Sequence, residues 1–221
     1  MKVAINGFGR IGKNLTRQLI EADCLSGGDG SLELVAVNDL GDVKANAHLL
    51  KFDSIHGKIG NAISTVGNNI IVDGSSISYI SERDPNKLPW KDHEIDVVFE
   101  CTGLFTSKEA ASAHLNAGAK RVIVSAPCTD ADKTIVFGIN HHKLELNDRV
   151  ISNASCTTNC LAPIADVIHK NFIIKSGLIN TVHAATNDQS LLDVAHSDLY
   201  RARAASASII PSKTGAAKAI G

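Results

Sequence analysis

The chain has 221 residues, of which 44% are hydrophobic and 20% charged, and its formal net charge is −1. This composition is typical of a globular protein with one large domain or two smaller ones, and the near-neutral charge excludes a general electrostatic attraction to nucleic acid or to an anionic membrane. The apolar runs are short, and the first ends at Asn6-Gly7, so we expect neither a membrane-spanning helix nor a secretory signal. The sequence therefore predicts a cytoplasmic protein.

Cysteine and histidine spacing bears on redox state and on metals. The five cysteines are an odd number without CxxC spacing, and the nine histidines include no HExxH pattern. Cysteines in a cytosolic chain stay reduced. We therefore predict neither a disulfide framework nor a metal site.

The first forty residues have the pattern of a βαβ unit. In chain order, the sequence predicts a strand, a glycine-rich turn, a helix, a loop and a second strand, over residues 1–6, 7–12, 13–22, 26–31 and 32–38. Asp39 closes the second strand.

The alternation of strands and helices continues over the next hundred residues. The pattern predicts helices over 45–50 and 107–117, a hairpin from 69–72 and 76–80, and buried strands over 97–101, 121–125 and 134–137. Continuous apolar strands of this kind are typical of a parallel sheet covered on both faces.

The character of the sequence changes near residue 155. A helix is expected over 156–169 and a long strand over 177–184, and the residues after them are mostly small and polar. We place a domain boundary here, with a first domain over 1–155 and a second over 156–221.

The glycine-rich turn has the spacing of a dinucleotide site. Gly7 permits the tight turn, Gly9 allows a pyrophosphate to approach the backbone, and Gly12 lets helix and strand pack closely. The helix start offers free N–H groups to phosphates, and the Asp39 carboxylate can accept hydrogen bonds from ribose hydroxyls. Two alternatives stay open: a purely structural turn, and a solvated charge rather than a phosphate contact for Arg10.

One cysteine has the surroundings of a nucleophile. Cys156 follows Ser155, a residue type suited to a helix N-cap, and begins the predicted helix. A helix start stabilises a thiolate and makes the cysteine a stronger nucleophile at neutral pH. We expect Cys160, one turn further on, to be a small buried side chain. His183, at the end of a predicted strand, would by itself be a histidine of the core.

Several stretches, in this order, match one enzyme family: INGFGRIG at 5–12, ECTG at 100–103, SAP at 125–127, SNASCTTNC at 152–160, TVHA at 181–184, TNDQ at 186–189, RARAA at 201–205 and IIPSKTGAAKAIG at 209–221. Through them the whole chain resembles the phosphorylating glyceraldehyde-3-phosphate dehydrogenases of glycolysis, which are NAD-dependent oxidoreductases.

The resemblance implies a fold and an assembly. It implies a Rossmann-type doubly wound parallel sheet, an α/β domain, over 1–155, followed over 156–221 by an incomplete α+β catalytic domain. Members of the family are longer, so the resemblance implies a C-terminally truncated chain with little or no turnover by itself. In its full-length form the family protein is expected to be a homotetramer.

The resemblance also implies a reaction. Cys156 would attack glyceraldehyde 3-phosphate with His183 as its base, and inorganic phosphate would cleave the resulting thioester. By resemblance, the residues of the two phosphate pockets are Ser155, Thr157, Thr214 and Gly215 for the attacking phosphate, Thr186 for the substrate phosphate, and Arg203 between them. Without the motifs, Thr186 and Thr214 would be interpreted as residues of solvated turns.

The family's NAD-binding pattern carries over to residues on several predicted turns, namely Asn6, Phe8, Gly9, Arg10, Ile11, Asp39, Arg83, Thr102, Gly103, Phe105 and Ser125. A carboxylate at Asp39 repels a 2′-phosphate, which favours NAD over NADP. Ala195 stands where many NAD-specific members have proline, and this weakens the expected exclusion of NADP.

Three alternatives remain at this stage. The SCTTNC core at 155–160 is shared with erythrose-4-phosphate dehydrogenases. The chain could instead be an inactive NAD-binding fragment, or an interaction protein that uses an exposed sheet edge. Binding of NAD and turnover of the two aldehydes distinguish these alternatives.

Overall fold

A computed structural model describes residues 1–25 and 32–220, so the loop predicted over 26–31 lies outside the described residues. The described chain divides into two compact units, Met1–Ser155 and Cys156–Gly221. No helix within the described ranges is both long and apolar enough to cross a membrane. Each unit is considered by itself below.

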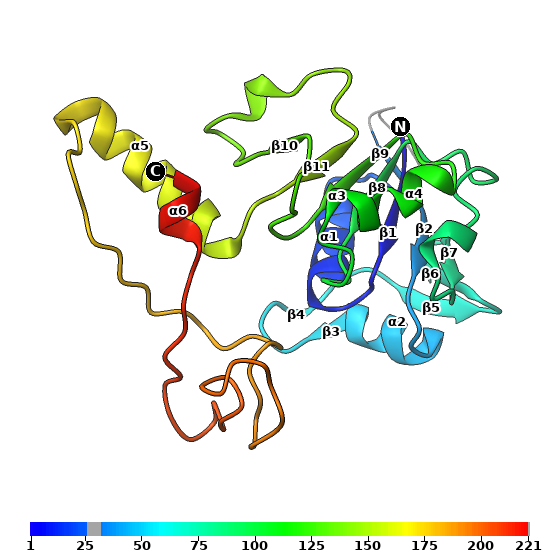
Figure 1. Ribbon diagram of the computed structural model, residues 1–221. Helices are drawn as coiled ribbons and strands as arrows, with labels where there is room; N and C mark the ends of the chain where they lie inside the picture. The colour runs from blue at the N-terminus through cyan, green and yellow to red at the C-terminus, as the bar shows by residue number, and fades with distance from the viewer. Residues whose placement is uncertain (26–31, 221) are drawn as a thin grey trace. The chain divides into compact units, whose positions relative to one another are not determined.

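A large, mostly parallel sheet forms the centre of the first unit (Figure 1). Its strand order is β10-β11-β9-β8-β1-β2-β7-β6-β5. The strands are β1 (Lys2–Asn6), β2 (Glu33–Asn38), β5 (Ile63–Val66), β6 (Asn69–Val72), β7 (Ser75–Ile80), β8 (Val97–Glu100), β9 (Arg121–Val124), β10 (Lys133–Thr134) and β11 (Val150–Ser152). Only the β7–β6 and β6–β5 pairings are antiparallel. The α/β fold class predicted from the sequence is therefore confirmed.

Strand β1 lies inside the sheet, with β2 on one side and β8 on the other. The chain runs from β1 to β2 on one side and later returns to β8 on the other side of β1, and both pairings are parallel. The strand order therefore reverses between β1 and β8. In open α/β sheets this reversal leaves a crevice at the carboxyl ends of the strands, where ligands bind.

Short helices connect the strands of the first unit. They are α1 (Arg10–Glu21), α2 (Val43–Lys51), α3 (Lys108–Ala111) and α4 (Ala113–Asn116), with single 3-10 turns η1 (Pro85–Lys87) and η2 (His141–Lys143). A separate small pair, β3 (Phe52–Asp53) and β4 (Gly57–Lys58), follows α2. The β3–β4 pair, β5 and β11 are elements that the sequence pattern did not predict.

Both faces of the parallel sheet are covered, as predicted. Alternate side chains of a strand point to opposite faces. On β1, Val3 and Ile5 pack in one cluster with residues of α1 and α2, whereas Ala4 belongs to a second cluster built around Trp90. The buried strands thus hold the turns at their carboxyl ends in fixed positions.

Arg17 of α1 fixes the segment after α2. Its guanidinium is buried and donates from Nε and Nη2 to Leu50 O at 3.0 and 2.8 Å, and from Nη2 to Lys51 O at 3.1 Å and to Gly57 O at 2.8 Å. Carbonyls at a helix end have no partner within the helix. Arg17 supplies that partner at the end of α2 and also holds β4 through the carbonyl of Gly57.

The predicted hairpin is confirmed. Strands β6 and β7 pair antiparallel around Asp73 and Gly74, whose φ angles are +49° and +89°. Such a turn suits the twist of two hairpin strands, and Asp-Gly is a preferred sequence for it.

Two predicted elements of the first unit are wrong in extent. The helix expected over 107–117 is split into α3 and α4 at Ser112, whose hydroxyl donates to Lys108 O at 2.6 Å. A serine that bonds back to the preceding turn bends a helix. The strand expected over 134–137 ends at Thr134, because the side chain of Asn140 accepts from Val136 N–H at 2.8 Å.

The second unit holds two helices, α5 (Cys156–Phe172) and α6 (Ala216–Ile220), which pack against each other (Figure 1). The predicted helix over 156–169 is confirmed. The strand predicted over 177–184 is wrong, since these residues are extended without strand pairing in the described part of the unit. An extended segment becomes a strand only when a neighbouring strand satisfies its N–H and C=O groups.

The glycine-rich turn of the first unit allows a test of the close packing between the start of α1 and the turn after β1. A Cβ on Gly12 would lie 2.2 Å from Gly7 O, whereas a Cβ on Gly9 would meet nothing within 4 Å. We expect Gly12→Ala to lower the free energy of unfolding by about 2 kcal/mol or more, since the backbone must shift to admit the methyl group. Gly9→Ala is the matched control and should unfold close to the unaltered chain. Urea denaturation followed by the fluorescence of the single tryptophan measures both, and equal stability of the two variants would contradict the packing described.

Candidate cofactor and nucleophile sites

The residues predicted to bind the cofactor follow strand ends at one edge of the sheet. Asn6 lies opposite Asn38 and Glu100, Asn38 opposite Ile80, and Glu100 opposite Val124. The strands therefore end in one row at this edge. The predicted set lies in this row or in the segments that follow it, at Asn6, Phe8, Gly9, Arg10, Ile11, Asp39, Arg83, Thr102, Gly103, Phe105 and Ser125.

The turn after β1 leaves room for a ligand at the start of α1. Gly9 caps α1 without a side-chain hydrogen bond to the helix, and the space that its Cβ would occupy is open. Phe8 is fully buried, and its N–H and C=O bond to Asp39 and Lys13, whereas Ile11 is 51% exposed. Free N–H groups beside open space fit a pyrophosphate.

A buried cation supports the same turn. Lys13 Nζ donates to Phe8 O, and its ammonium lies 5.0 Å from the centre of the Phe8 ring. Burial lowers the pKa of Lys13, and the carboxylate of Asp39 acts in the opposite direction. Lys13 was not among the predicted residues, because a lysine in a helix normally points to solvent.

The Asp39 carboxylate is held by several donors. Its Oδ2 accepts from Phe8 N–H at 2.8 Å, and its Oδ1 accepts from Gly41 N–H at 2.8 Å and from Asn46 Nδ2 at 3.2 Å. A carboxylate has about four acceptor sites, so capacity remains for a ribose hydroxyl.

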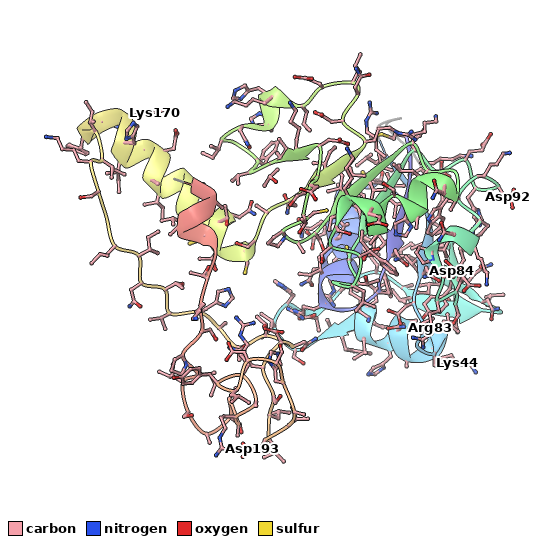
Figure 2. The ribbon with its side chains drawn as sticks, viewed as in Figure 1. Lys44, Arg83, Asp84, Asp92, Lys170 and Asp193 are labelled. Atoms are coloured by element: carbon pink, nitrogen blue, oxygen red, sulfur yellow. The ribbon has the colours of Figure 1, made fainter. Side chains whose placement is uncertain are left out.

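The two arginines of the predicted set differ in their surroundings. Arg10 forms an ion pair with Asp53, and Arg83 is exposed (Figure 2). Backbone N–H donors of His56 and Ile55 hold the pKa of Asp53 well below its usual range, and Arg10 lowers it further. The observed partner of Arg10 is therefore Asp53, which differs from both predicted alternatives, a phosphate contact and a solvated charge.

A buried carboxylate joins the two strands at the point of reversal. Glu100 accepts four hydrogen bonds: from Asn6 Nδ2 at 2.6 Å, from His114 Nε2 at 2.9 Å, from Thr102 N–H at 2.7 Å and from the Thr102 hydroxyl. The indole N–H of Trp90 donates to His114 Nδ1 at 3.0 Å. Because an indole only donates, Nδ1 is the acceptor and Nε2 carries the proton given to Glu100.

The segment after β8 completes this edge of the sheet. Gly103 has a φ of +75°, and the Phe105 ring lies edge-on to His114 with centroids 6.2 Å apart. Burial raises the pKa of the Cys101 thiol to about 12, although a hydrogen bond with Ser125 lowers it. Cys101 is therefore a neutral structural thiol, and Ser125 is held beside it.

Three residues of this edge were not predicted from the sequence: Glu100, His114 and Asn46. The ECTG stretch contained Glu100, and a charged residue that ends the apolar run VVFE is itself a signal. A charge in a buried strand requires hydrogen-bonding partners nearby.

A cysteine and a histidine meet in the second unit. Cys156 is the first residue of α5, and its Sγ lies 3.2 Å from His183 Nε2. His183 Nδ1 lies 2.7 Å from Ala184 O, and a carbonyl can only accept, so Nδ1 carries a proton. His183 Nε2 therefore faces the thiol and can take its proton.

The electrostatics of the pair favour the thiolate. Partial burial acts to raise the pKa of Cys156, but hydrogen bonds with His183 and Thr157 and the charge of His183 outweigh it and lower the pKa. The pKa of His183 is raised, first by its bond to Ala184 O and then by Cys156. A thiolate beside a protonated imidazole is the reactive form of a catalytic cysteine.

The predicted phosphate-binding side chains have local partners. The Thr186 hydroxyl accepts from Asp188 N–H at 3.3 Å, and Arg203 pairs with Asp193 at 2.7 Å. The position of Asp193 is shown in Figure 2. The Thr214 hydroxyl accepts from Ala216 N–H at 3.3 Å, just before α6.

The other predicted phosphate-binding residues lie beside the nucleophile or before α6. Ser155 and Thr157 flank Cys156, and a Cβ on Gly215 would meet nothing within 4 Å. The structure brings Cys156 and His183 together, whereas Thr186, Arg203 and Thr214 bond to other neighbours.

One expectation for α5 is wrong. Cys160 is exposed rather than buried, because the side of α5 that carries it is uncovered in this unit. Within the described residues, no group of three or more His, Cys, Asp or Glu side chains is arranged to hold a metal ion.

Fold and sites together define an α/β protein with a dinucleotide-binding edge and a helix-start cysteine paired with a histidine. Residues 1–108 match the domain described as "Glyceraldehyde 3-phosphate dehydrogenase, NAD binding domain", and residues 155–221 match the C-terminal domain of the same family. The chain belongs to the glyceraldehyde-3-phosphate dehydrogenase family.

Named relatives agree with these domain matches. The chain is 53% identical over 221 residues to a glyceraldehyde-3-phosphate dehydrogenase of Xanthobacter flavus, 54% to one of Zymomonas mobilis subsp. mobilis and 51% to one of Pseudomonas aeruginosa. These alignments include 100% of the chain but only 64%, 64% and 65% of the three relatives. The chain thus spans a little under two thirds of the length of these relatives.

Loss of the buried carboxylate should be costly. Glu100→Ala leaves Asn6, His114 and Thr102 without their acceptor, so we expect the free energy of unfolding to fall by about 3 kcal/mol. Glu94→Ala removes an exposed carboxylate paired with Lys2 and serves as the control, with a much smaller effect. Urea denaturation of both variants checks this, and a Glu100→Ala variant as stable as the control would disprove the role of the network.

The thiol pair predicts a selective pH profile. Because the pKa of Cys156 is lowered, iodoacetamide should alkylate Cys156 faster than the exposed Cys160 at pH 6 to 7, where an ordinary thiol is protonated. His183→Asn should shift the pH profile of Cys156 alkylation to higher pH. The alkylation rate at neutral pH should fall about tenfold for each unit by which the pKa of Cys156 rises. Peptide mass spectrometry measures both sites in one sample, with Cys160 as internal control. Equal profiles for the two cysteines would refute the pairing.

Proposed function

We propose that the chain provides the cofactor site and the nucleophile of a phosphorylating glyceraldehyde-3-phosphate dehydrogenase. The observation that carries the proposal is the approach of Cys156 Sγ to His183 Nε2, 3.2 Å, at the start of α5. From the family resemblance we infer the substrates: glyceraldehyde 3-phosphate, inorganic phosphate and NAD.

The cysteine performs the covalent chemistry. The Cys156 thiolate attacks the aldehyde carbon, and the carbonyl oxygen takes the Nε2 proton of the protonated His183, which gives a hemithioacetal and a neutral imidazole. His183 Nε2, which faces the sulfur, takes the hydroxyl proton of this adduct. The N–H of Cys156, at the helix start, is placed to stabilise charge that develops on the oxygen.

The oxidised adduct is a thioester of Cys156. An oxygen of inorganic phosphate attacks its carbonyl, the C–S bond breaks, and the thiolate and 1,3-bisphosphoglycerate are released. By family resemblance Ser155, Thr157, Thr214 and Gly215 bind this phosphate, Thr186 binds the substrate phosphate, and Arg203 serves both. Hydroxyl and guanidinium donors suit phosphate oxygens.

The first unit has room and donors for NAD. NAD, when bound, supplies the acceptor for the hydride of the aldehyde carbon. The start of α1 faces the open space at Gly9 and fits the pyrophosphate, and Asp39 has acceptor capacity for the adenosine ribose. The remaining contacts are proposed for Asn6, Phe8, Arg10, Ile11, Arg83, Thr102, Gly103, Phe105 and Ser125.

Two further properties belong to the same proposal. We expect a homotetramer for the full-length protein from the family resemblance, and a cytoplasmic location from the short apolar runs of the sequence.

The decisive assay follows NADH absorbance after NAD, phosphate and glyceraldehyde 3-phosphate are mixed with the chain. Phosphate-dependent NADH formation should disappear in Cys156→Ser, because the hydroxyl is a far weaker nucleophile than the thiolate. Erythrose 4-phosphate as the aldehyde should react more slowly. Gly9→Ala should weaken NAD binding, since its methyl group occupies the space beside the helix start.

The possible outcomes separate the alternatives. NADH formation that persists in Cys156→Ser would refute the assigned nucleophile. NAD binding without NADH formation would identify the 221-residue chain as an inactive cofactor-binding fragment. Absence of NAD binding would refute the cofactor site itself.

A further inference from the structure

A buried polar pair lies behind Asp39. Asn46 of α2 and Tyr79 of β7 are each 7% exposed. Asn46 Nδ2 donates to the Tyr79 hydroxyl oxygen at 2.6 Å and also lies 3.2 Å from Asp39 Oδ1. Two polar side chains at this depth need such partners, since an unpaired one would destabilise the fold.

The pair closes a ring of hydrogen bonds with the segment after β2. The Tyr79 hydroxyl donates to Gly41 O at 2.8 Å, and Gly41 N–H donates to Asp39 Oδ1 at 2.8 Å. A Cβ on Gly41 would come within 3.0 Å of both Asn46 Nδ2 and Asp39 Oδ1, so glycine lets these groups meet. Asp39, Gly41, Tyr79 and Asn46 thus restrain one another.

The ring limits where the Asp39 carboxylate can go. Phe8 N–H holds its other oxygen, Oδ2, at 2.8 Å, so both oxygens are held. Strand β7 pairs in parallel with β2, with Tyr79 opposite Val37, so Tyr79 itself is fixed by the sheet. Burial raises the pKa of Tyr79, Asn46 acts to lower it, and the carboxylates of Asp39 and Asp42 raise it further, so the phenol stays a donor.

Positive charge is nevertheless present on the elements that border Asp39. Lys44 lies in the first turn of α2, and Arg83 follows β7; both are exposed (Figure 2). A 2′-phosphate could therefore find cations if Asp39 turned away, because a carboxylate beside a phosphate repels it. Rejection of the phosphate depends on whether Asp39 can turn.

We propose that Asn46 and Tyr79 are specificity-determining positioning residues, which hold Asp39 beside the 2′ position of the adenosine ribose and make the site reject a 2′-phosphate. This inference rests on the proposed NAD site. It assigns to two residues outside the predicted cofactor set the choice between NAD and NADP.

Equilibrium binding of NAD and of NADP to the 221-residue chain, each by calorimetric titration, tests the inference. The unaltered chain should prefer NAD. Tyr79→Phe keeps the ring and removes the hydroxyl, and Asn46→Ala removes the amide; each should reduce the ratio of NAD to NADP affinity about fivefold, the size expected for one lost hydrogen bond.

The chain offers a matched control and a coupled background. Tyr200→Phe removes the hydroxyl of the other tyrosine, which is 64% exposed in the second unit, and should leave both affinities unchanged. In an Asp39→Ala background, Tyr79→Phe should not change the ratio further, because it acts through Asp39. Partial unfolding scales both affinities alike and leaves their ratio unchanged, so a loss of stability does not imitate the effect.

The results distinguish the inference from the proposal on which it rests. An unchanged ratio in both Tyr79→Phe and Asn46→Ala, with NAD binding intact, would overturn the inference and leave the cofactor site standing. An equal change in the Asp39→Ala background would also overturn it. Failure of the unaltered chain to bind either nucleotide would overturn both.

Discussion

The buried side chain of Glu100 joins the segments of the first unit that border the proposed nucleotide site. Glu100 ends β8 at the reversal of strand order and accepts bonds from β1 through Asn6, from α4 through His114, and from the segment after β8 through Thr102. A buried carboxylate is stable only when all its acceptor sites are used. Its requirement for partners therefore fixes the register of β1 against β8, and with it the position of the glycine-rich turn above them.

The two sites are positioned in different ways. At the cofactor edge, each important backbone or side-chain group has partners from several strands and helices, so its geometry follows from the packing of the whole sheet. The nucleophile depends on features of the second unit alone: the start of α5, the hydroxyl of Thr157, and His183, which is held by the carbonyl of the next residue. Because these groups of the second unit lower the pKa of Cys156, the reactive thiol does not require a preformed cofactor edge.

The sequence predicted local structure correctly where a residue type favours one backbone conformation or one position. The three glycines, the apolar strands around them and a cysteine preceded by serine predicted the βαβ unit and the start of α5 correctly. It was less informative where the outcome depends on a distant partner. Residues 177–184 have strand-forming composition but no pairing in the described unit, and Ser112 and Asn140 end elements through side-chain bonds that periodicity does not reveal. The ring around Asp39 was missed for two reasons: Tyr79 lies on a strand far from Asp39 in sequence, and periodicity does not show that Asn46, seven residues on, turns its amide toward Asp39.

Arg17 shows how a residue outside the predicted cofactor and catalytic sets can be intolerant to exchange. One guanidinium serves carbonyls of Leu50, Lys51 and Gly57, which lie 33, 34 and 40 residues along the chain. The planar fork of an arginine can reach several acceptors at once, and the single ammonium of a lysine cannot. An exchange that conserves charge would thus release the end of α2 and the small β3–β4 pair together. In a survey of natural variants, Arg17 should therefore be as invariant as the residues of an active centre while having no part in the chemistry.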